Sequence, residues 1–266
     1  MTVPPEAPPF PAAADHRVCA VVVAYFPAAA GLRRLFAATL PQVSALVLVD
    51  NGAGDAALRQ ADVPADKGGI VLLKQERNIG LAAAFNRGIA WARQGGYTHV
   101  LLLDQDSEPA PGMVAALGQA LTASLGGRRI AAVGPRFHDA REDRFAPFVR
   151  VGFPLNHKIY DGGPDGLVAC DFLISSGSLI PLEVLAEVGA MDEGLFIDNV
   201  DLEWGFRALA KGYALAGVCR ATMHHRLGRG RRSLPLGLGH IVVHDPGRLY
   251  YIMRNRLLLY GLPDTP

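Results

Sequence analysis

The sequence lacks any run of about 18 apolar residues free of charged or turn residues, the length that a bilayer span requires, so no transmembrane helix is predicted. It also lacks a charge imbalance, because 26 Lys and Arg nearly match 25 Asp and Glu, which gives no reason to expect a nucleic-acid partner. Its three cysteines are few, odd in number and far apart, without metal-ligand spacing. Such cysteines are typical of reduced thiols in a cytosolic protein.

The N-terminal residues 1–15 are rich in Pro and Ala but have neither the basic region nor the long apolar region of a signal peptide. We expect them to form a flexible lead. The remaining residues, 16–266, are numerous enough to bury a sizeable core, since half of the chain is hydrophobic. This size fits one α/β domain.

Apolar strand patterns alternate with helical patterns along the first part of the chain. The predicted strands are 17–25, 45–49, 70–74 and 100–103, and the predicted helices are 28–40 and one that opens at Asn78 or Gly80. This alternation predicts an α/β fold with a doubly wound, mostly parallel sheet and helices on both faces. The helix opening at Asn78 or Gly80 is expected to offer free backbone N–H groups to an anion.

Asp104 and Asp106 follow the apolar run 100–103 in the sequence HVLLLDQDSEP. Open α/β sheets bind ligands beyond the carboxyl ends of such strands. Two carboxylates this close repel each other unless a cation or a basic group lies between them, and hard oxygen ligands suit Mg²⁺ or Mn²⁺ bridging to phosphate. The pair therefore predicts a site for a divalent metal and a diphosphate. Taken alone, Asp-x-Asp also fits an ordinary turn or helix cap.

The second part of the chain is less regular. A helix at 112–125 and a short strand at 130–133 precede the segment 136–166, which we interpret as a loop or hairpin, either an acceptor-binding or lid segment or a plain surface excursion. A strand is predicted at 213–219. The C-terminal residues 248–260 have helical spacing that fits core packing or a helix at a membrane surface.

A second acidic group, DNVDLEWGFR, begins at Asp198 and contains Asp201 and Glu203. Asp198 or Asn199 is a reasonable N-cap for the helix that follows. Carboxylates in the first turn of a helix are stabilising by themselves, so the composition of this group does not require a catalytic role.

Six blocks occur in an order that resembles a known family: VVVAYFP, LVDNGAGD, RNIGLAAAFNRGI, LLLDQDSEP, ISSGSLIP and FIDNVDLEWGFRA. They resemble the family 2 glycosyltransferases of the GT-A fold, and most closely their bacterial rhamnosyltransferase branch. The resemblance implies an inverting hexosyltransferase that uses dTDP-β-L-rhamnose and a divalent metal, Mg²⁺ or Mn²⁺. It further implies a saccharide or lipid-linked acceptor in cell-surface polysaccharide synthesis. The cysteines predict a cytoplasmic protein, which is either free in the cytoplasm or, through its C-terminal helix, peripheral at the inner face of the plasma membrane.

The resemblance assigns roles within residues 16–110, the nucleotide-binding half. Asp50 matches the aspartate that recognises the base edge, although an aspartate before Asn-Gly also forms turns. Arg77 and Asn78 match the block beside the nucleotide, where a guanidinium can pair with the diphosphate; without the resemblance Arg77 would be read as a solvated charge. Asp106 matches the direct metal ligand, and Asp104 is expected to face the ribose and sugar.

Within residues 111–266, the acceptor-binding half, the resemblance assigns the catalytic base. Matching the acidic group through Arg207 puts Asp201 on the base and Glu203 on the next acidic position, with Val200 in place of the usual Glu. His225 resembles a metal or diphosphate contact through its spacing to Gly228; the alternative is a loop histidine without a ligand.

Three alternatives remain open at this stage. The donor could be another nucleotide sugar, such as a UDP-sugar. A nucleotidyltransferase also carries carboxylates at a sheet edge, but residues 21–27 lack the Gly-rich, Lys-containing phosphate loop it would favour. A non-catalytic nucleotide-sugar-binding protein would keep the fold without the base.

Overall fold

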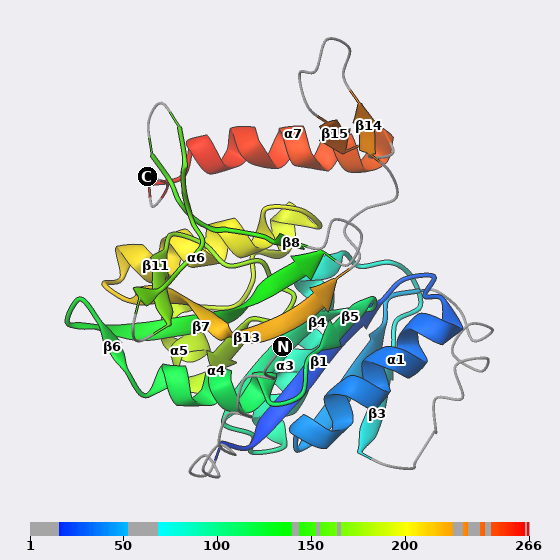
Figure 1. Ribbon diagram of the computed structural model, residues 1–266. Helices are drawn as coiled ribbons and strands as arrows, with labels where there is room; N and C mark the ends of the chain where they lie inside the picture. The colour runs from blue at the N-terminus through cyan, green and yellow to red at the C-terminus, as the bar shows by residue number, and fades with distance from the viewer. Residues whose placement is uncertain are drawn as a thin grey trace.

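The computed structural model describes residues 16–52, 69–139, 144–152, 155–163, 166–225, 231–233, 240–242, 246–263 and 265. The predicted lead, 1–15, lies outside this described part. An 11-stranded sheet has the main order β11-β13-β7-β12-β4-β1-β2-β3, with β5, β6 and β8 beside it. Figure 1 shows this sheet running through the molecule with helices around it. Among the described residues, no helix combines the length and apolar character needed to cross a membrane.

The sheet is built from strands of very different length. Its members are β1 (Val18–Ala24), β2 (Ala45–Asp50), β3 (Ile70–Lys74), β4 (His99–Asp104), β5 (Ser107–Pro109), β6 (Ser124–Leu125), β7 (Arg128–Asp139), β8 (Arg144–Phe145), β11 (Leu167–Cys170), β12 (Leu179–Pro181) and β13 (Ala214–His225). The α-helices described are α1 (Ala29–Thr39), α3 (Leu81–Gln94), α4 (Met113–Leu121), α5 (Leu182–Val188), α6 (Val200–Ala210) and α7 (Pro246–Tyr260), with 3₁₀ turns η1 (Leu40–Gln42) and η3 (Glu193–Leu195).

The two faces of the sheet are covered by different helices, as the alternation of strands and helices predicts. Alternate residues of β1 point to opposite sides: Val21 lies in the core cluster that contains Phe85 of α3, and Val22 lies in the cluster that contains Leu35 of α1 and Leu117 of α4. β4, β1, β2 and β3 pair in parallel. The prediction of an α/β fold with a mostly parallel, doubly wound sheet is confirmed.

The second half of the sheet departs from the prediction. The short strand β12 runs antiparallel between β4 and β7, in the middle of the sheet, where the sequence predicts no strand. The strands predicted at 130–133 and 213–219 are parts of the 12-residue strands β7 and β13, which pair in parallel with shifts in register. The helix predicted at 112–125 ends at Leu121, and β6 follows.

The segment 136–166 is largely a set of hairpin strands in its described part. Its first residues continue β7, β8 pairs back onto β7, and β9 (Phe148–Arg150) forms an antiparallel pair with β10 (His157–Ile159). A second small pair joins β14 (Arg231–Ser233) and β15 (His240–Val242). The hairpin interpretation of this segment is therefore the correct one.

The C-terminal helix is confirmed, but core packing does not explain its apolar residues. α7 lies above α6 in the view of Figure 1, and only Asn255 and Leu259 of this helix are buried. Its large exposed side chains are Leu249, Tyr250, Met253, Leu257, Leu258 and Tyr260.

Candidate functional site

The predicted nucleotide residues lie at the carboxyl edge of the parallel strands. Asp104 pairs in register with Val23 on one side of β1, and Asp50 pairs with Ala24 on the other side. Because neighbouring strands lie about 4.8 Å apart, the two aspartates lie about 10 Å apart across the end of β1. This is the edge at which open α/β sheets bind ligands.

The backbone at Asp50 and Gly52 packs against the segment that carries Arg77 and Asn78. Asp50 is only 3% exposed, and its carbonyl oxygen accepts a hydrogen bond from the Gln75 N–H at 2.9 Å. Gly52 packs so closely that an added Cβ would lie 2.6 Å from the Arg77 carbonyl carbon. The structure thus brings the backbone of Asp50 close to the segment that carries the exposed Arg77.

The side chains of Asn51 and Asn78 hydrogen-bond to each other and to the backbone that leads into α3. The Asn51 Nδ2 donates to Asn78 Oδ1 at 3.0 Å, and Asn51 Oδ1 accepts from the Ile79 N–H at 2.9 Å. Asn78 Oδ1 also accepts from the Gly80 N–H at 2.9 Å. The amide of Asn78 is therefore committed to the turn that enters α3.

The anion-binding role predicted for the first turn of α3 is wrong. α3 begins after Gly80, as predicted, but the N–H groups of Leu81 and Ala82 donate to the carbonyl oxygen of Phe196 at 2.6 and 3.3 Å. A helix N-terminus attracts anions through its free N–H groups, and here a distant carbonyl already occupies them. The N–H groups of Leu81 and Ala82 are therefore not available to a diphosphate.

The Asp104–Asp106 turn is fixed on both sides. Gln105 Oε1 accepts a hydrogen bond from the Tyr25 N–H at 2.7 Å, which ties the turn to the end of β1. The Asp104 N–H donates to Ser176 Oγ at 3.3 Å. Asp104 is partly buried, whereas Asp106 is exposed, so Asp106 is the carboxylate with the freer approach to a ligand.

These residues fit a divalent cation with oxygen ligands. In the described part of the chain, no three His, Cys, Asp or Glu side chains gather as a metal centre. Mg²⁺ is usually bound by one or two carboxylates together with substrate phosphates, which suits Asp104 and Asp106. β13 pairs with β5 so that His225 stands opposite Ser107, next to Asp106 in sequence. His225 is thus the last residue of a strand and not a loop residue; its side chain lies outside the described part.

Asp201 stands in the first turn of α6 with both carboxylate oxygens hydrogen-bonded to the backbone. Oδ2 accepts from the Ser175 N–H at 3.1 Å, and Oδ1 accepts from the Leu202 N–H at 3.0 Å. Burial raises the pKa of the Asp201 carboxyl, these N–H donors lower it, and the nearby Asp198 raises it. A carboxylate whose pKa is raised is a better proton acceptor at neutral pH.

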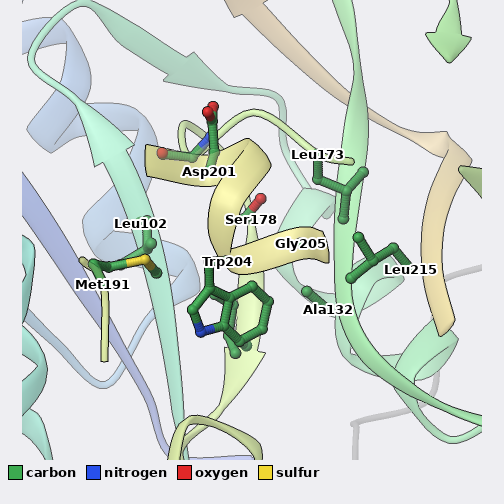
Figure 2. A pocket seen from close by; sticks show the side chains of 11 residues that line it. Leu102, Ala132, Leu173, Ser178, Met191, Asp201, Trp204, Gly205 and Leu215 are labelled. Atoms are coloured by element: carbon green, nitrogen blue, oxygen red, sulfur yellow. The ribbon is translucent and has the colours of Figure 1, made fainter. Parts of the chain in front are cut away.

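The cavity below Asp201 is a packing gap rather than a substrate pocket. It has a volume of about 20 Å³, room for about one water molecule, and its lining is mainly apolar. In Figure 2 the Asp201 carboxylate points away from the Trp204 ring and the apolar side chains around it. The carboxylate therefore lies at one end of this gap, turned away from its apolar lining.

Glu203 has a structural role. Its carboxylate is buried and pairs with both Arg207 Nε and Arg207 Nη2, the latter at 2.8 Å. Arg207 also donates to the carbonyl oxygens of Val188 and Ala190 at 2.9 and 2.7 Å. This network fastens α6 to the end of α5. Glu203 therefore has a structural role, which differs from the role proposed for Asp201.

The segment before α6 is held in an uncommon conformation. Phe196, Asp198 and Asn199 have φ of 64°, 62° and 62°, values that are sparsely populated for residues other than glycine. Asn199 is the N-cap residue, as predicted, but its side chain makes no capping hydrogen bond. Contacts from elsewhere in the chain must therefore fix this segment.

α7 supplies those contacts. The side-chain amide of Asn255 is fully buried and donates to the carbonyl oxygens of Leu195, Ile197 and Asp198, each at 2.8 Å. Arg248 pairs with the Asp198 carboxylate, with Nη2 2.9 Å from Oδ1. The C-terminal helix thus holds the segment that both caps α3 and starts α6.

Replacing Asn255 by alanine should lower the free energy of unfolding by about 1–3 kcal/mol, because buried carbonyl oxygens lose their donor. The change is measured by urea denaturation. The neighbouring Arg256→Ala, at an exposed position, is the control and should stay within about 0.5 kcal/mol of the wild type. Equal stability of the two variants would show that α7 does not hold this segment.

Comparison with known proteins decides the family. The model of a family described as "Glycosyl transferase family 2" matches residues 19–177, which is more than half of the chain. The chain belongs to glycosyltransferase family 2. The family 2 model covers the Asp50, Arg77 and Asp104–Asp106 segments and extends to the turn that contains Ser175 and Ser176.

Individual relatives of this glycosyltransferase agree with the family. The dTDP-rhamnosyl transferase RfbF of Shigella flexneri is 30% identical over 253 residues, covering 95% of this chain and 82% of the relative. GalNAc-T7, solved with UDP, GalNAc and Mn²⁺, superposes with a TM-score of 0.63 and 16% identity over 78% of this chain. TarS 1–349 of S. aureus gives 0.51 and 14% over 79%. The alignments span 43% and 60% of those two solved chains, and at such identities they show the GT-A fold alone.

Some groups that shape this glycosyltransferase site were missed from the sequence. Ser107 and Ser176 stand in two of the quoted blocks, yet nothing in a serine's immediate neighbours indicates that it meets another serine. Asn255 lies in an amphipathic C-terminal pattern and gives no sign of its three carbonyl partners. A buried polar residue among apolar helix positions is the one signal that could have directed attention to it.

Proposed function

We propose that this enzyme is an inverting rhamnosyltransferase that moves L-rhamnose from dTDP-β-L-rhamnose to a hydroxyl group of a saccharide or lipid-linked acceptor. The observation that carries the proposal is the 30% identity to a dTDP-rhamnosyl transferase across 95% of the chain. The grouping of Asp50, Arg77, Asp104 and Asp106 at one sheet edge, with Asp201 linked to it through residues 175 and 176, supports it.

The donor would bind across the carboxyl edge, within the nucleotide-binding half, residues 16–110. Asp50 would accept a hydrogen bond from the N–H of the pyrimidine base, the pairing that a carboxylate can make with thymine or uracil. Arg77 would pair with the diphosphate, and Asn78 would fix the loop that carries Arg77. Asp104 would face the ribose and the sugar.

Asp106 and Asp104 would hold Mg²⁺ or Mn²⁺, and His225, whose backbone pairs with that of Ser107 beside Asp106, is proposed as a further ligand. The fold relative GalNAc-T7 was solved with Mn²⁺, in agreement with this cofactor class. When bound, such a cation offsets negative charge on the departing diphosphate. The protein's own contribution there is the pair of carboxylates and the cationic Arg77.

The acceptor would be activated by Asp201, in the acceptor-binding half, residues 111–266. An inverting transfer needs a base that takes the proton of the acceptor hydroxyl while its oxygen attacks the sugar on the face opposite the leaving group. The raised pKa of Asp201 and its fixed orientation suit that role. No covalent sugar–enzyme intermediate is required in this mechanism.

A lipid-linked acceptor would bring the enzyme to the inner face of the plasma membrane, and α7 has a surface that suits this. Tyr250, Met253, Leu257 and Tyr260 are 58–80% exposed and follow one another at helical spacing. The helix has three arginines and no acidic residue. Such a composition favours binding to anionic lipid. Co-sedimentation with anionic vesicles should be lost in the Leu257→Ser, Tyr260→Ser double variant; unchanged binding would exclude α7 as the contact.

The dependence of kcat/KM on pH should show the ionisation of the Asp201 carboxyl. Because the base must be ionised, kcat/KM should rise with pH through the Asp201 pKa, at a pH above the ordinary aspartate value of 3.8. Arg248→Met removes the partner of Asp198, whose charge then raises the Asp201 pKa further and moves this limb to higher pH. The exposed Arg256→Met is the control. An unmoved limb in Arg248→Met would contradict the assignment of the base.

The test of the function is release of the nucleoside diphosphate and sugar transfer in the presence of candidate acceptors. dTDP-β-L-rhamnose should be turned over, and a UDP-sugar should be turned over more slowly. Turnover of the UDP-sugar alone would overturn the donor while keeping the enzyme class. Membership of family 2 argues against the nucleotidyltransferase and non-catalytic alternatives.

A further inference from the structure

One turn contacts both the backbone of the Asp104–Asp106 turn and the carboxylate of the base. Residues 171–178 connect β11 to β12, and within them the Ser175 N–H donates to Asp201 Oδ2 at 3.1 Å. The next residue, Ser176, accepts a hydrogen bond on Oγ from the Asp104 N–H at 3.3 Å. Two adjacent residues therefore bridge the two acidic groups that the mechanism uses.

A pair of buried hydroxyl groups strengthens this bridge. Ser176 Oγ lies 2.5 Å from Ser107 Oγ, and the two residues are 2% and 0% exposed. Ser107 directly follows Asp106. Ser176 therefore binds both ends of the Asp104–Asp106 turn, the Asp104 N–H at its start and the Ser107 hydroxyl just after its end. A hydrogen bond enclosed in this way meets no competition from water, and each hydroxyl depends on the other.

The turn itself cannot shift independently of the sheet. The Gly177 N–H donates to the Leu102 carbonyl oxygen at 2.7 Å, and the Leu102 N–H donates to the Ser178 carbonyl oxygen at 3.0 Å. Gly177 has a φ of 83°, and an added Cβ would lie 2.7 Å from both Met223 Cε and Pro135 Cγ. The turn is therefore locked onto β4, the strand that delivers Asp104.

We propose that Ser176, through Ser107 and the Asp104 N–H, is a positioning residue that fixes the Asp104–Asp106 turn relative to the base Asp201. This inference rests on the proposed function, because it needs a donor held at the carboxylates and an acceptor held at Asp201. A displacement of about 1 Å between reacting groups can lower the rate by about 100-fold. The hydroxyl pair limits that displacement without touching either substrate.

The first test is Ser176→Ala with the donor that the wild-type chain turns over. We expect kcat to fall by about 10- to 100-fold, with a much smaller change in the dissociation constant for the nucleoside diphosphate. Ser178→Ala is the matched control, because its buried hydroxyl donates only to the Ile174 carbonyl oxygen in the same turn. The control should keep the wild-type kcat.

The double variant Ser107→Ala, Ser176→Ala separates positioning from folding. Ser176→Ala leaves the buried Ser107 hydroxyl without its partner, and removing both hydroxyls relieves that defect. The Asp104 N–H still lacks its acceptor, so the melting temperature should recover in part in the double variant. The bridge is absent in both cases, and kcat should therefore stay as low as in Ser176→Ala.

Recovery of kcat together with the melting temperature would overturn the proposal and leave the hydroxyl pair a folding contact only. A wild-type kcat in Ser176→Ala would overturn it as well. Turnover of a nucleotide sugar other than dTDP-rhamnose would refute the proposed donor. It would not affect the test of Ser176, since the ratio of variant to wild-type rates is measured with whichever donor is turned over.

Discussion

Replacing Asp201 by asparagine should lower kcat by about 100- to 10,000-fold, because the acceptor hydroxyl loses the group that takes its proton. The amide keeps the size of the carboxyl, and its oxygen can still accept the hydrogen bond from the Ser175 N–H. Binding of dTDP should be unchanged, since the nucleotide contacts that we propose lie at the ends of β2, β3 and β4. The measurements are steady-state transfer rates and calorimetric titration of dTDP.

The stability of this variant provides an internal control. The pKa of Asp201 is raised by burial, so the ionised carboxylate opposes folding and stability decreases as the pH rises through that pKa. Asparagine removes this electrostatic cost at neutral pH, but its NH2 group replaces one of the two oxygens that accept backbone N–H groups, and that hydrogen bond is lost. The two effects oppose each other, so the free energy of unfolding should stay within about 1 kcal/mol of the wild-type value. Asp192→Asn makes the same chemical change at an exposed cap position, where asparagine is equally suitable, and should keep full activity. Near-normal transfer by Asp201→Asn would exclude Asp201 as the base.

Replacing Asp106 by asparagine should lower kcat/KM by about 100- to 1000-fold and remove the dependence of nucleotide binding on metal. Asp106 is the more exposed of the two carboxylates and follows the end of β4 in a turn that Gln105 ties to Tyr25. The variant keeps the shape of the turn but loses the negative charge that a divalent cation requires. Titrations of dTDP with and without Mn²⁺ check this.

Glu108→Gln is the matched control for Asp106. Glu108 lies two residues further on in β5, where its carboxylate pairs with Arg34 at 2.6 Å, a contact at the partly exposed surface. Such a pair contributes little to stability, so this control should bind nucleotide and metal as the wild type does. A metal effect that survives in Asp106→Asn, or disappears in Glu108→Gln, would contradict the assignment of the metal ligand.

The placement of Asp50 and Asp104 at one edge of the sheet was predictable because it depends on local pattern. Continuous aliphatic runs end at Asp50 and Asp104, and the rule that ligands bind beyond the carboxyl ends of parallel strands places both at one edge. The strand boundaries agree for the same reason, since burial on both faces leaves an unmistakable apolar run. The helix opening at Gly80 was also predicted correctly.

The errors concern contacts between residues that are far apart in the sequence. The first turn of α3 looked free, yet the carbonyl oxygen of Phe196 occupies it. β12 was missed because three residues carry no periodicity, and its place in the sheet depends on pairing with β4. The Ser107–Ser176 pair and the contacts of Asn255 arise in the same way, from elements that only the fold brings together.

The most direct test of the account is calorimetric titration of the wild-type protein with dTDP and with UDP, each with and without Mn²⁺. The account predicts binding that depends on the metal and favours dTDP, because the carboxylate pair needs a cation before it can hold a diphosphate. Failure of both nucleotides to bind would contradict both the donor and the role of Asp104 and Asp106. Equal binding with and without Mn²⁺ would contradict the role of the two carboxylates, and equal binding of dTDP and UDP would contradict the donor.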